Sequence, residues 1–196
     1  MTATWSLNEI EALALKAARG AGFEWGLAEE AGQAVRWLLA RDLPGADALL
    51  AICVAGSSKT PEFCPLTFGC ALCDGLVSVS NATSRKVVAP LLVLPFLAWT
   101  AKREKTSLSL EWKGAAFVVT ADGTLMGSAD NPIIKHATVT VGLVENCDLS
   151  PSKIGHRALV DCETYVALSD LAARTYAPAT AASRESGAGA GLTDND

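Results

Sequence analysis

Residues 85–127 constrain the fold of this 196-residue chain more than any other segment. In residues 107–112 every second side chain is apolar, so a strand here has one apolar face and one polar face. Gly114 follows Lys113 and Gly123 follows Asp122, each at a position where a reversing backbone needs a positive φ. The two expected turns separate the strand at residues 115–120 from its neighbours on both sides. This pattern predicts an antiparallel β-meander with one covered face.

The composition predicts one compact domain, because half of the residues are hydrophobic and only 19% are charged. We expect a single α+β domain over residues 1–178, in which an N-terminal helical group and a C-terminal helix cover the antiparallel sheet. The expected parts are a mainly helical part at residues 1–75, the sheet at 76–145, a C-terminal helix at 160–177, and a flexible tail rich in glycine and alanine at 179–196.

Ser6 and Glu9 form a capping-box pattern, which predicts that a helix begins there and runs to the glycines at 20 and 22. A second helix is expected over residues 26–40, with small Ala28 and Gly32 allowing close approach of a partner. Further elements are predicted as short helices at residues 47–54 and 66–73, a strand at 135–141 and a helix at 161–176.

Residues 87–99 contain no charge, but the run is shorter than the roughly 20 residues that a membrane-spanning helix needs. Pro90 and Pro95 would each remove a helical hydrogen bond, so we interpret the run as one or two buried strands that are broken or bulged at the prolines. We therefore predict no membrane partner.

The net charge of −5 opposes binding to nucleic acid. The basic clusters at residues 85–86 and 102–105 are short and are expected at strand ends, so we predict no nucleic-acid partner. The N-terminus lacks a basic region followed by an apolar core, so we expect a cytoplasmic location, where the cysteines would be free thiols.

Arg19, Gly20, Gly22 and Trp25 form the best candidate site for a small anion. Exposed amides at a helix start attract anions, glycines let a ligand approach the backbone, and an arginine can grip a carboxylate or phosphate in a forked contact. Arg184 and the glycine tail are candidates for a lid. The alternative is a plain helical hairpin, in which the first glycine caps the first helix and Arg19 lies at the negative helix end.

Cys53, Cys64, Cys70 and Cys73 are numerous enough to hold a structural zinc ion. Apolar residues surround most of them, and on a helix Cys70 and Cys73 would share one inward face. We therefore predict core packing and no metal, with a redox pair as a further alternative.

His136 and His156 are the candidate catalytic residues for hydrolysis or proton transfer, because the ordinary pKa of histidine lies near neutrality. His136 is expected on the polar face of its strand. His156 precedes Cys162 by six residues, and a nucleophilic Cys-His pair is therefore a further hypothesis. A structural or surface role is the alternative for each histidine.

The opening of the chain, at residues 6–13, 17–22 and 25–32, and its ending, at residues 187–196, resemble an uncharacterised family of bacterial proteins of about this length. That resemblance implies no activity and transfers no catalytic residue. The first 50 residues are also similar to the opening of the malate and lactate dehydrogenases outside the Rossmann group, which use a nicotinamide cofactor. Because the chain lacks their Ser-His-Gly sequence and is far shorter, we predict no cofactor.

Two functions therefore remain open, with a structural-zinc protein as a third. The first is a cytoplasmic protein of bacterial small-molecule metabolism that binds a small anionic ligand, with or without catalysis. The second is a non-enzymatic accessory subunit whose helical hairpin docks a partner enzyme or a second copy of the chain. An enzyme is expected to have a pocket where basic, histidine and carboxylate groups converge, and a subunit is expected to have a flat apolar patch.

Overall fold

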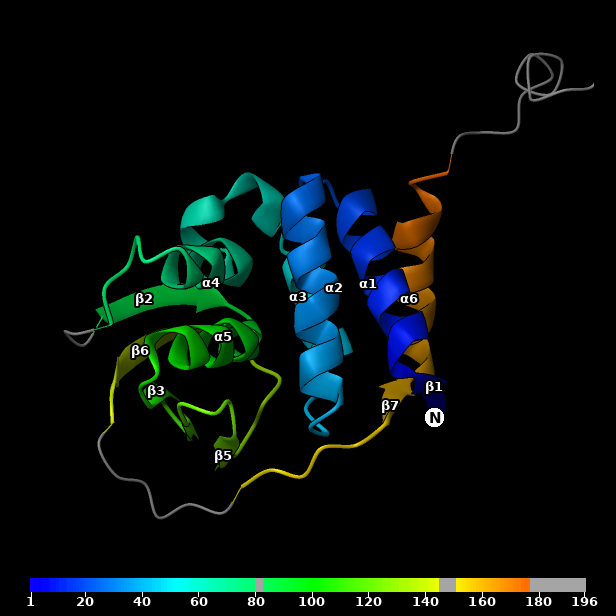
Figure 1. Cartoon of the computed structure of the whole chain (residues 1–196). Coiled ribbons are helices and arrows are strands. Elements are labelled where there is room, and N and C mark those ends of the chain that lie inside the picture. The colour runs from blue at the N-terminus through cyan, green and yellow to red at the C-terminus, as the bar shows by residue number, and fades with distance from the viewer. Residues whose placement is uncertain (80–82, 145–150, 177–196) are drawn as a thin grey trace, which may run out of the picture.

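The computed structural model describes residues 1–79, 83–144 and 151–176, which form an α+β fold and confirm the predicted fold class (Figure 1). On one side of the molecule, four helices pack against one another. A five-stranded sheet and two further helices form the other side. The four packed helices are α1 (Leu7–Gly20), α2 (Trp25–Leu39), α3 (Gly45–Val54) and α6 (Cys162–Ala173). None of the described helices is both long enough and apolar enough to cross a bilayer.

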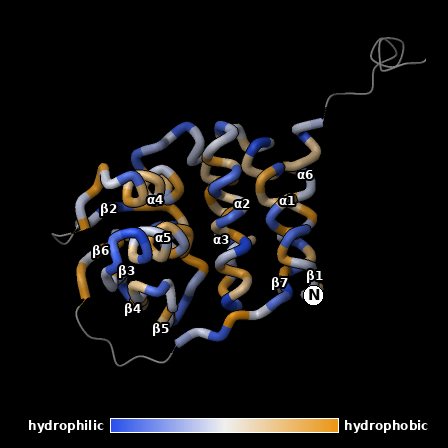
Figure 2. Tube along the Cα trace, viewed as in Figure 1, coloured by the Kyte–Doolittle hydropathy of each residue, from blue (hydrophilic) through white to orange (hydrophobic). Residues whose placement is uncertain are grey.

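Helices α1 and α2 form the predicted hairpin. Ser6 Oγ accepts a hydrogen bond from Glu9 N at 3.1 Å, and Glu9 Oε2 accepts one from Ser6 N at 2.9 Å, which confirms the capping box. Hydrophobic and hydrophilic residues alternate along both helices (Figure 2), as expected for helices with one buried side. Ala28 is fully buried, and a Cβ on Gly32 would lie 3.0 Å from Glu11 O, so these small residues allow α1 and α2 to pack closely.

The larger sheet is antiparallel throughout, with the order β2-β6-β3-β4-β5. Gly114 and Gly123 have φ values of 83° and 87°, which confirms the predicted turns. Strands β3, β4 and β5 therefore form the expected meander, while β6 returns to pair with β3 on the other side. The strands are β2 (Thr83–Val88), β3 (Leu108–Trp112), β4 (Ala115–Val119), β5 (Leu125–Ala129) and β6 (His136–Leu143).

The prediction of strands through residues 87–99 is wrong beyond Val88. Ala89 adopts a left-handed conformation with φ 42°, and a short 3-10 helix η3 (Pro90–Val93) leads into helix α5 (Leu94–Glu104). Both prolines lie in the first turn of their helices, where a backbone N–H has no intrahelical partner and its loss costs little. The basic cluster at 102–105 consequently lies at the end of a helix, and the cluster at 85–86 lies inside β2, so the expected place of both at strand ends is wrong.

The C-terminal helix does not cover the large sheet, so that part of the predicted arrangement is also wrong. Helix α6 packs against α1 and α3 at the far side of the helical group (Figure 1). Helix α5, η3 and the 3-10 segment at residues 61–63 contact the sheet instead. Helix α4 (Pro65–Cys73) packs on α5, where a Cβ on Gly69 would lie 2.3 Å from the Phe96 ring. The remaining short segments are η1 (Ser57–Lys59) and η2 (Pro61–Phe63).

A second, two-stranded sheet was not predicted. Strand β1 (Thr2–Ser6) pairs antiparallel with β7 (Arg157–Asp161), and the terminal amino group lies 3.1 Å from Asp161 Oδ1. This pairing joins segments that are more than 150 residues apart in the sequence and brings α6 back to α1. The N-terminal and C-terminal parts of the described chain therefore lie side by side.

Candidate functional site

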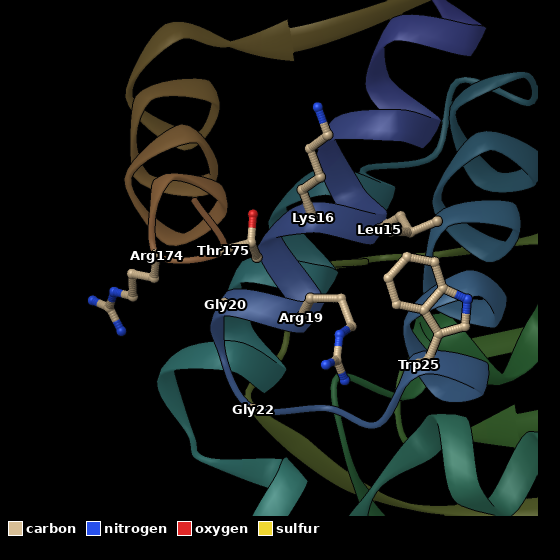
Figure 3. A pocket seen from close by; sticks show the side chains of 8 residues that line it. All are labelled: Leu15, Lys16, Arg19, Gly20, Gly22, Trp25, Arg174 and Thr175. Carbon is tan, nitrogen blue, oxygen red and sulfur yellow. The ribbon is translucent and has the colours of Figure 1, made fainter. Parts of the chain in front are cut away.

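The predicted anion-site residues line one pocket of about 500 Å³ at the junction of α1, α2 and the end of α6 (Figure 3). Arg19, Gly20, Gly22 and Trp25 all belong to its wall. Arg184, the predicted lid residue, and the tail at 179–196 lie outside the described residues. The complete lining is Leu15, Lys16, Arg19, Gly20, Gly22, Trp25, Arg174 and Thr175.

The chain reversal between α1 and α2 shapes the floor of this pocket. Gly22 has φ 92°, and Phe23 N donates to Ala18 O at 3.1 Å, so the first helix ends in a capped turn that sends the buried Phe23 into the core. The alternative interpretation as a capped hairpin therefore describes the backbone correctly, with Gly22 and not Gly20 as the left-handed residue. Gly20 has a different role, because a Cβ there would lie 1.8 Å from Leu171 O in α6.

Three basic side chains make the pocket electropositive. Lys16 and Arg19 lie on α1, and Arg174 follows the last turn of α6. Arg19 lies between the Gly22 loop and Trp25, whereas Arg174 extends on the other side of Gly20 (Figure 3). In the described part of the chain none of the three forms an ion pair, and no Asp or Glu side chain is among the described lining residues.

The hydrogen bonds of the basic groups leave much of their donor capacity free. Arg19 Nη1 donates to Phe23 O at 2.6 Å, and its guanidinium carbon lies 5.6 Å from the Trp25 ring centroid. Lys16 Nζ donates to Tyr176 Oη at 3.3 Å. An arginine carries five N–H donors and a lysine three, so donors remain for an anion. The N-cap residue of α2, Glu24, makes no side-chain capping hydrogen bond.

The structure does not bring the predicted catalytic histidines to this pocket. His136, at the start of β6, is exposed and lines a separate apolar pocket of about 270 Å³ with Val54 and Val88. His156 is also exposed and lines another pocket, between α1, α2 and α5. Cys162 lies at the opposite end of the extended strand β7 from His156, about 20 Å away, so the imagined Cys-His pair is wrong.

The cysteines of the described chain are free, and their surroundings disfavour thiolates. Burial raises the pKa of Cys53 and of Cys70 to about 12, and it also raises the pKa of Cys73. Cys73 Sγ donates to Phe96 O at 3.4 Å. The described residues contain no group of three or more metal-ligating side chains arranged to hold an ion.

Sequence reasoning missed Lys16, Arg174 and Thr175. Lys16 precedes Arg19 by three residues, so both lie on the same side of one helix, and this spacing could have identified it. Arg174 reaches the pocket because α6 packs on α1, and no local pattern near residue 174 indicates that packing.

Residues 5–67 match the model of a family described as "Protein of unknown function (DUF3726)". The predicted resemblance to an uncharacterised family is therefore confirmed over this part of the chain, which contains the α1–α2 hairpin with Lys16, Arg19 and Trp25. Comparison with curated proteins and with solved structures found no significant match.

Proposed function

We propose that this chain binds a small anion, a carboxylate or a phosphate, in the pocket lined by Lys16, Arg19 and Arg174, and that it serves bacterial small-molecule metabolism in the cytoplasm. The observation that carries the proposal is that three basic side chains line one pocket, whose described lining contains no acidic residue, and that none of the three forms an ion pair within the described part of the chain. The free cysteines are in keeping with a cytoplasmic location.

Electrostatics supports this proposal. Like charges that line one pocket repel one another, and a bound anion offsets that repulsion with attraction. The whole chain is acidic, with a net charge of −5, so a pocket lined by three basic groups differs in sign from the overall charge. The exposed Trp25 ring, 58% accessible, offers an apolar surface beside the charges for the body of a small organic anion.

Binding is better supported than catalysis. No histidine and no carboxylate lines this pocket, so its described lining lacks a side chain that commonly transfers protons near neutral pH. Hydrolysis or proton transfer by His136 or His156 would have to take place elsewhere, because each histidine lines a different pocket.

The accessory-subunit alternative loses the feature on which it was based. Ala28 and Gly32 were expected to let a partner approach, but Ala28 is fully buried and Gly32 packs against Glu11 and Leu15 of α1. They therefore offer no docking surface. The exposed face of α2 instead contributes Trp25 and Gln33 to two of the pockets.

The proposal can be tested by isothermal titration calorimetry with inorganic phosphate, pyrophosphate and citrate. We expect saturable binding of at least one of these anions, and Arg19→Gln should weaken it by about tenfold or more, because a hydrogen bond to a charged group contributes about 1.5–3 kcal/mol. Lys102→Gln is the matched control, since Lys102 is an exposed base in the last turn of α5 outside the pocket. Absence of binding, or equal affinity in Arg19→Gln and the wild type, would remove the proposal.

A further inference from the structure

A second pocket, of about 630 Å³, lies at the other end of the α1–α2 hairpin. Its walls come from the start of α1, the end of α2, one side chain of α5 and the segment at residues 154–156. Two indole rings, one of them stacked with an arginine, distinguish it from the first pocket. The lining is Leu7, Glu11, Gln33, Arg36, Trp37, Ala40, Arg41, Trp99, Ile154, Gly155 and His156.

Arg41 is the central feature of this second pocket. Its guanidinium carbon lies 3.8 Å from the centroid of the Trp37 ring, and its Nη1 donates to Trp37 O at 3.1 Å. The guanidinium is therefore held against the indole as a planar, charged surface. Burial lowers the pKa of Arg41, because the charge is partly removed from water.

The charge of Arg41 is not balanced by a carboxylate. In the described part of the chain no acidic group lies within ion-pair distance of it. Its neighbour Arg36 differs, because Arg36 Nη1 lies 2.8 Å from Glu11 Oε2 and also donates to Asn8 Oδ1. The pocket thus contains one arginine that is already neutralised and one that is available to an anion.

Internal contacts hold two walls of the pocket in place. Gly155 N donates to Ala40 O at 2.6 Å, which fixes the segment at 154–156 against the end of α2. The Trp99 ring meets the buried Phe96 ring edge-on, with centroids 5.0 Å apart. A rigid pocket of this kind loses little entropy when a rigid, flat ligand enters it.

We propose that this second pocket binds a planar aromatic carboxylate. The carboxylate would accept the free N–H donors of Arg41 in a forked contact, and the flat ring would lie against the surfaces of Trp37, Arg41 and Trp99. Arginine suits this role because its planar group both stacks on rings and pairs with carboxylates in a bidentate way. The proposal is independent of the anion site at Arg19, since the two pockets share no lining residue.

Benzoate is the probe, compared with cyclohexanecarboxylate, which has the charge without the flat ring, and benzyl alcohol, which has the ring without the charge. Calorimetry and tryptophan fluorescence quenching on the full chain should both show saturable benzoate binding. We expect each of the other two compounds to bind at least about tenfold more weakly. Equal affinity for benzoate and cyclohexanecarboxylate, or no saturable benzoate binding, would overturn the proposal.

Arg41→Gln should raise the dissociation constant for benzoate by about tenfold or more. The matched control is Arg85→Gln, because Arg85 also lies over an aromatic ring, that of Phe68 at 5.2 Å, but outside both pockets. Arg41→Lys keeps the charge and loses the planar guanidinium, so it should also bind benzoate more weakly than the wild type. If Arg41→Gln does not fold, the affinity of Arg41→Lys tests the proposal in its place.

Benzoate is itself an anion, so its location has to be assigned. If Arg19→Gln abolishes benzoate binding while Arg41→Gln leaves it unchanged, benzoate occupies the first pocket and the aromatic-carboxylate site is refuted. If Arg41→Gln abolishes benzoate binding while phosphate binding stays intact, the second pocket is supported whatever becomes of the first.

Discussion

Replacement of Gly20 by alanine gives the sharpest test of how α1 and α6 pack. The added Cβ would lie 1.8 Å from Leu171 O and 2.7 Å from Leu171 C, whereas ordinary contact begins near 3.4 Å. The obstructing atoms belong to the backbone of α6, so no side-chain rotation can make room. The two helices must therefore separate locally by about 1.6 Å, or the turn must deform.

The magnitude follows from two opposing terms. Overpacking in a well-packed interior costs about 1–3 kcal/mol, and separating the helices also loosens the fully buried Ala17 and Leu168. Alanine is a better helix former than glycine by at most about 1 kcal/mol, and less at the last residue of a helix. We expect Gly20→Ala to lose about 2 kcal/mol of unfolding free energy, which lowers the melting temperature by about 4–8 °C for a chain of this size.

The assay is urea unfolding followed by far-UV circular dichroism, with Gly26→Ala as the matched control. Gly26 lies in the first turn of α2, and a Cβ there meets no atom within 4 Å, so alanine should leave the stability unchanged or raise it by about 0.5 kcal/mol. A Gly20→Ala protein that unfolds at the wild-type urea concentration would show that the inferred approach of the two helices is wrong.

Three further predictions concern local interactions. Ser6→Ala should lower the unfolding free energy by about 1 kcal/mol in the same urea assay, because it removes the oxygen that caps α1; an unchanged midpoint would mean that the capping box contributes nothing. Hydrogen bonds from Glu163 N and from the terminal amino group lower the pKa of Asp161 in the folded protein, so Asp161 stabilises the fold above its ordinary pKa of 3.8 and stops doing so as the pH falls through the lower folded pKa. Asp161→Asn should therefore make the unfolding free energy depend less steeply on pH in the acid range. An unchanged slope would contradict this prediction. Burial raises the pKa of Cys53 and of Cys70 to about 12, so at pH 8 each has about a thousandfold less thiolate than a thiol with the ordinary pKa of 9.0. Iodoacetamide should therefore modify both cysteines far more slowly in the native protein than in urea, as measured by peptide mass spectrometry. Equal modification rates in the two conditions would show that these cysteines are not buried.

The elements that the sequence predicts correctly are those with local signals. The capping box at Ser6 marks the start of α1, and Gly114 and Gly123 mark the turns of the meander, because each signal acts within a few residues. The segment from Pro90 to Glu104 has no such signal. Its first nine residues are buried on every side, so neither a period of 2 nor one of 3.6 appears, and the two prolines fit a helix start as well as a broken strand.

The candidate site divides in the same way. Arg19, Gly20, Gly22 and Trp25 are neighbours in the sequence, so a hairpin alone brings them to one pocket. Arg174 is placed by the pairing of β1 with β7 and by the packing of α6 on α1, both of which join distant segments. Long-range pairing of this kind depends on the whole fold, and a pattern in a short window does not indicate it.

The two pockets have a common construction that bears on which part of the chain recognises a ligand. Lys16, Arg19 and Arg41 all lie on the α1–α2 hairpin or directly after it, within the residues that match the family model. Arg174 and Trp99, which complete the two pockets, lie outside that match. The matched part therefore supplies three of the charged donors, and the remainder of the chain supplies walls that set shape and size. We accordingly expect substitutions at Arg19 and Arg41 to reduce the affinity for all anions that their respective pockets accept, because a positive charge strengthens the binding of every anion. A substitution at Trp99 should instead change the preference among anions, because a flat wall favours only a flat ligand.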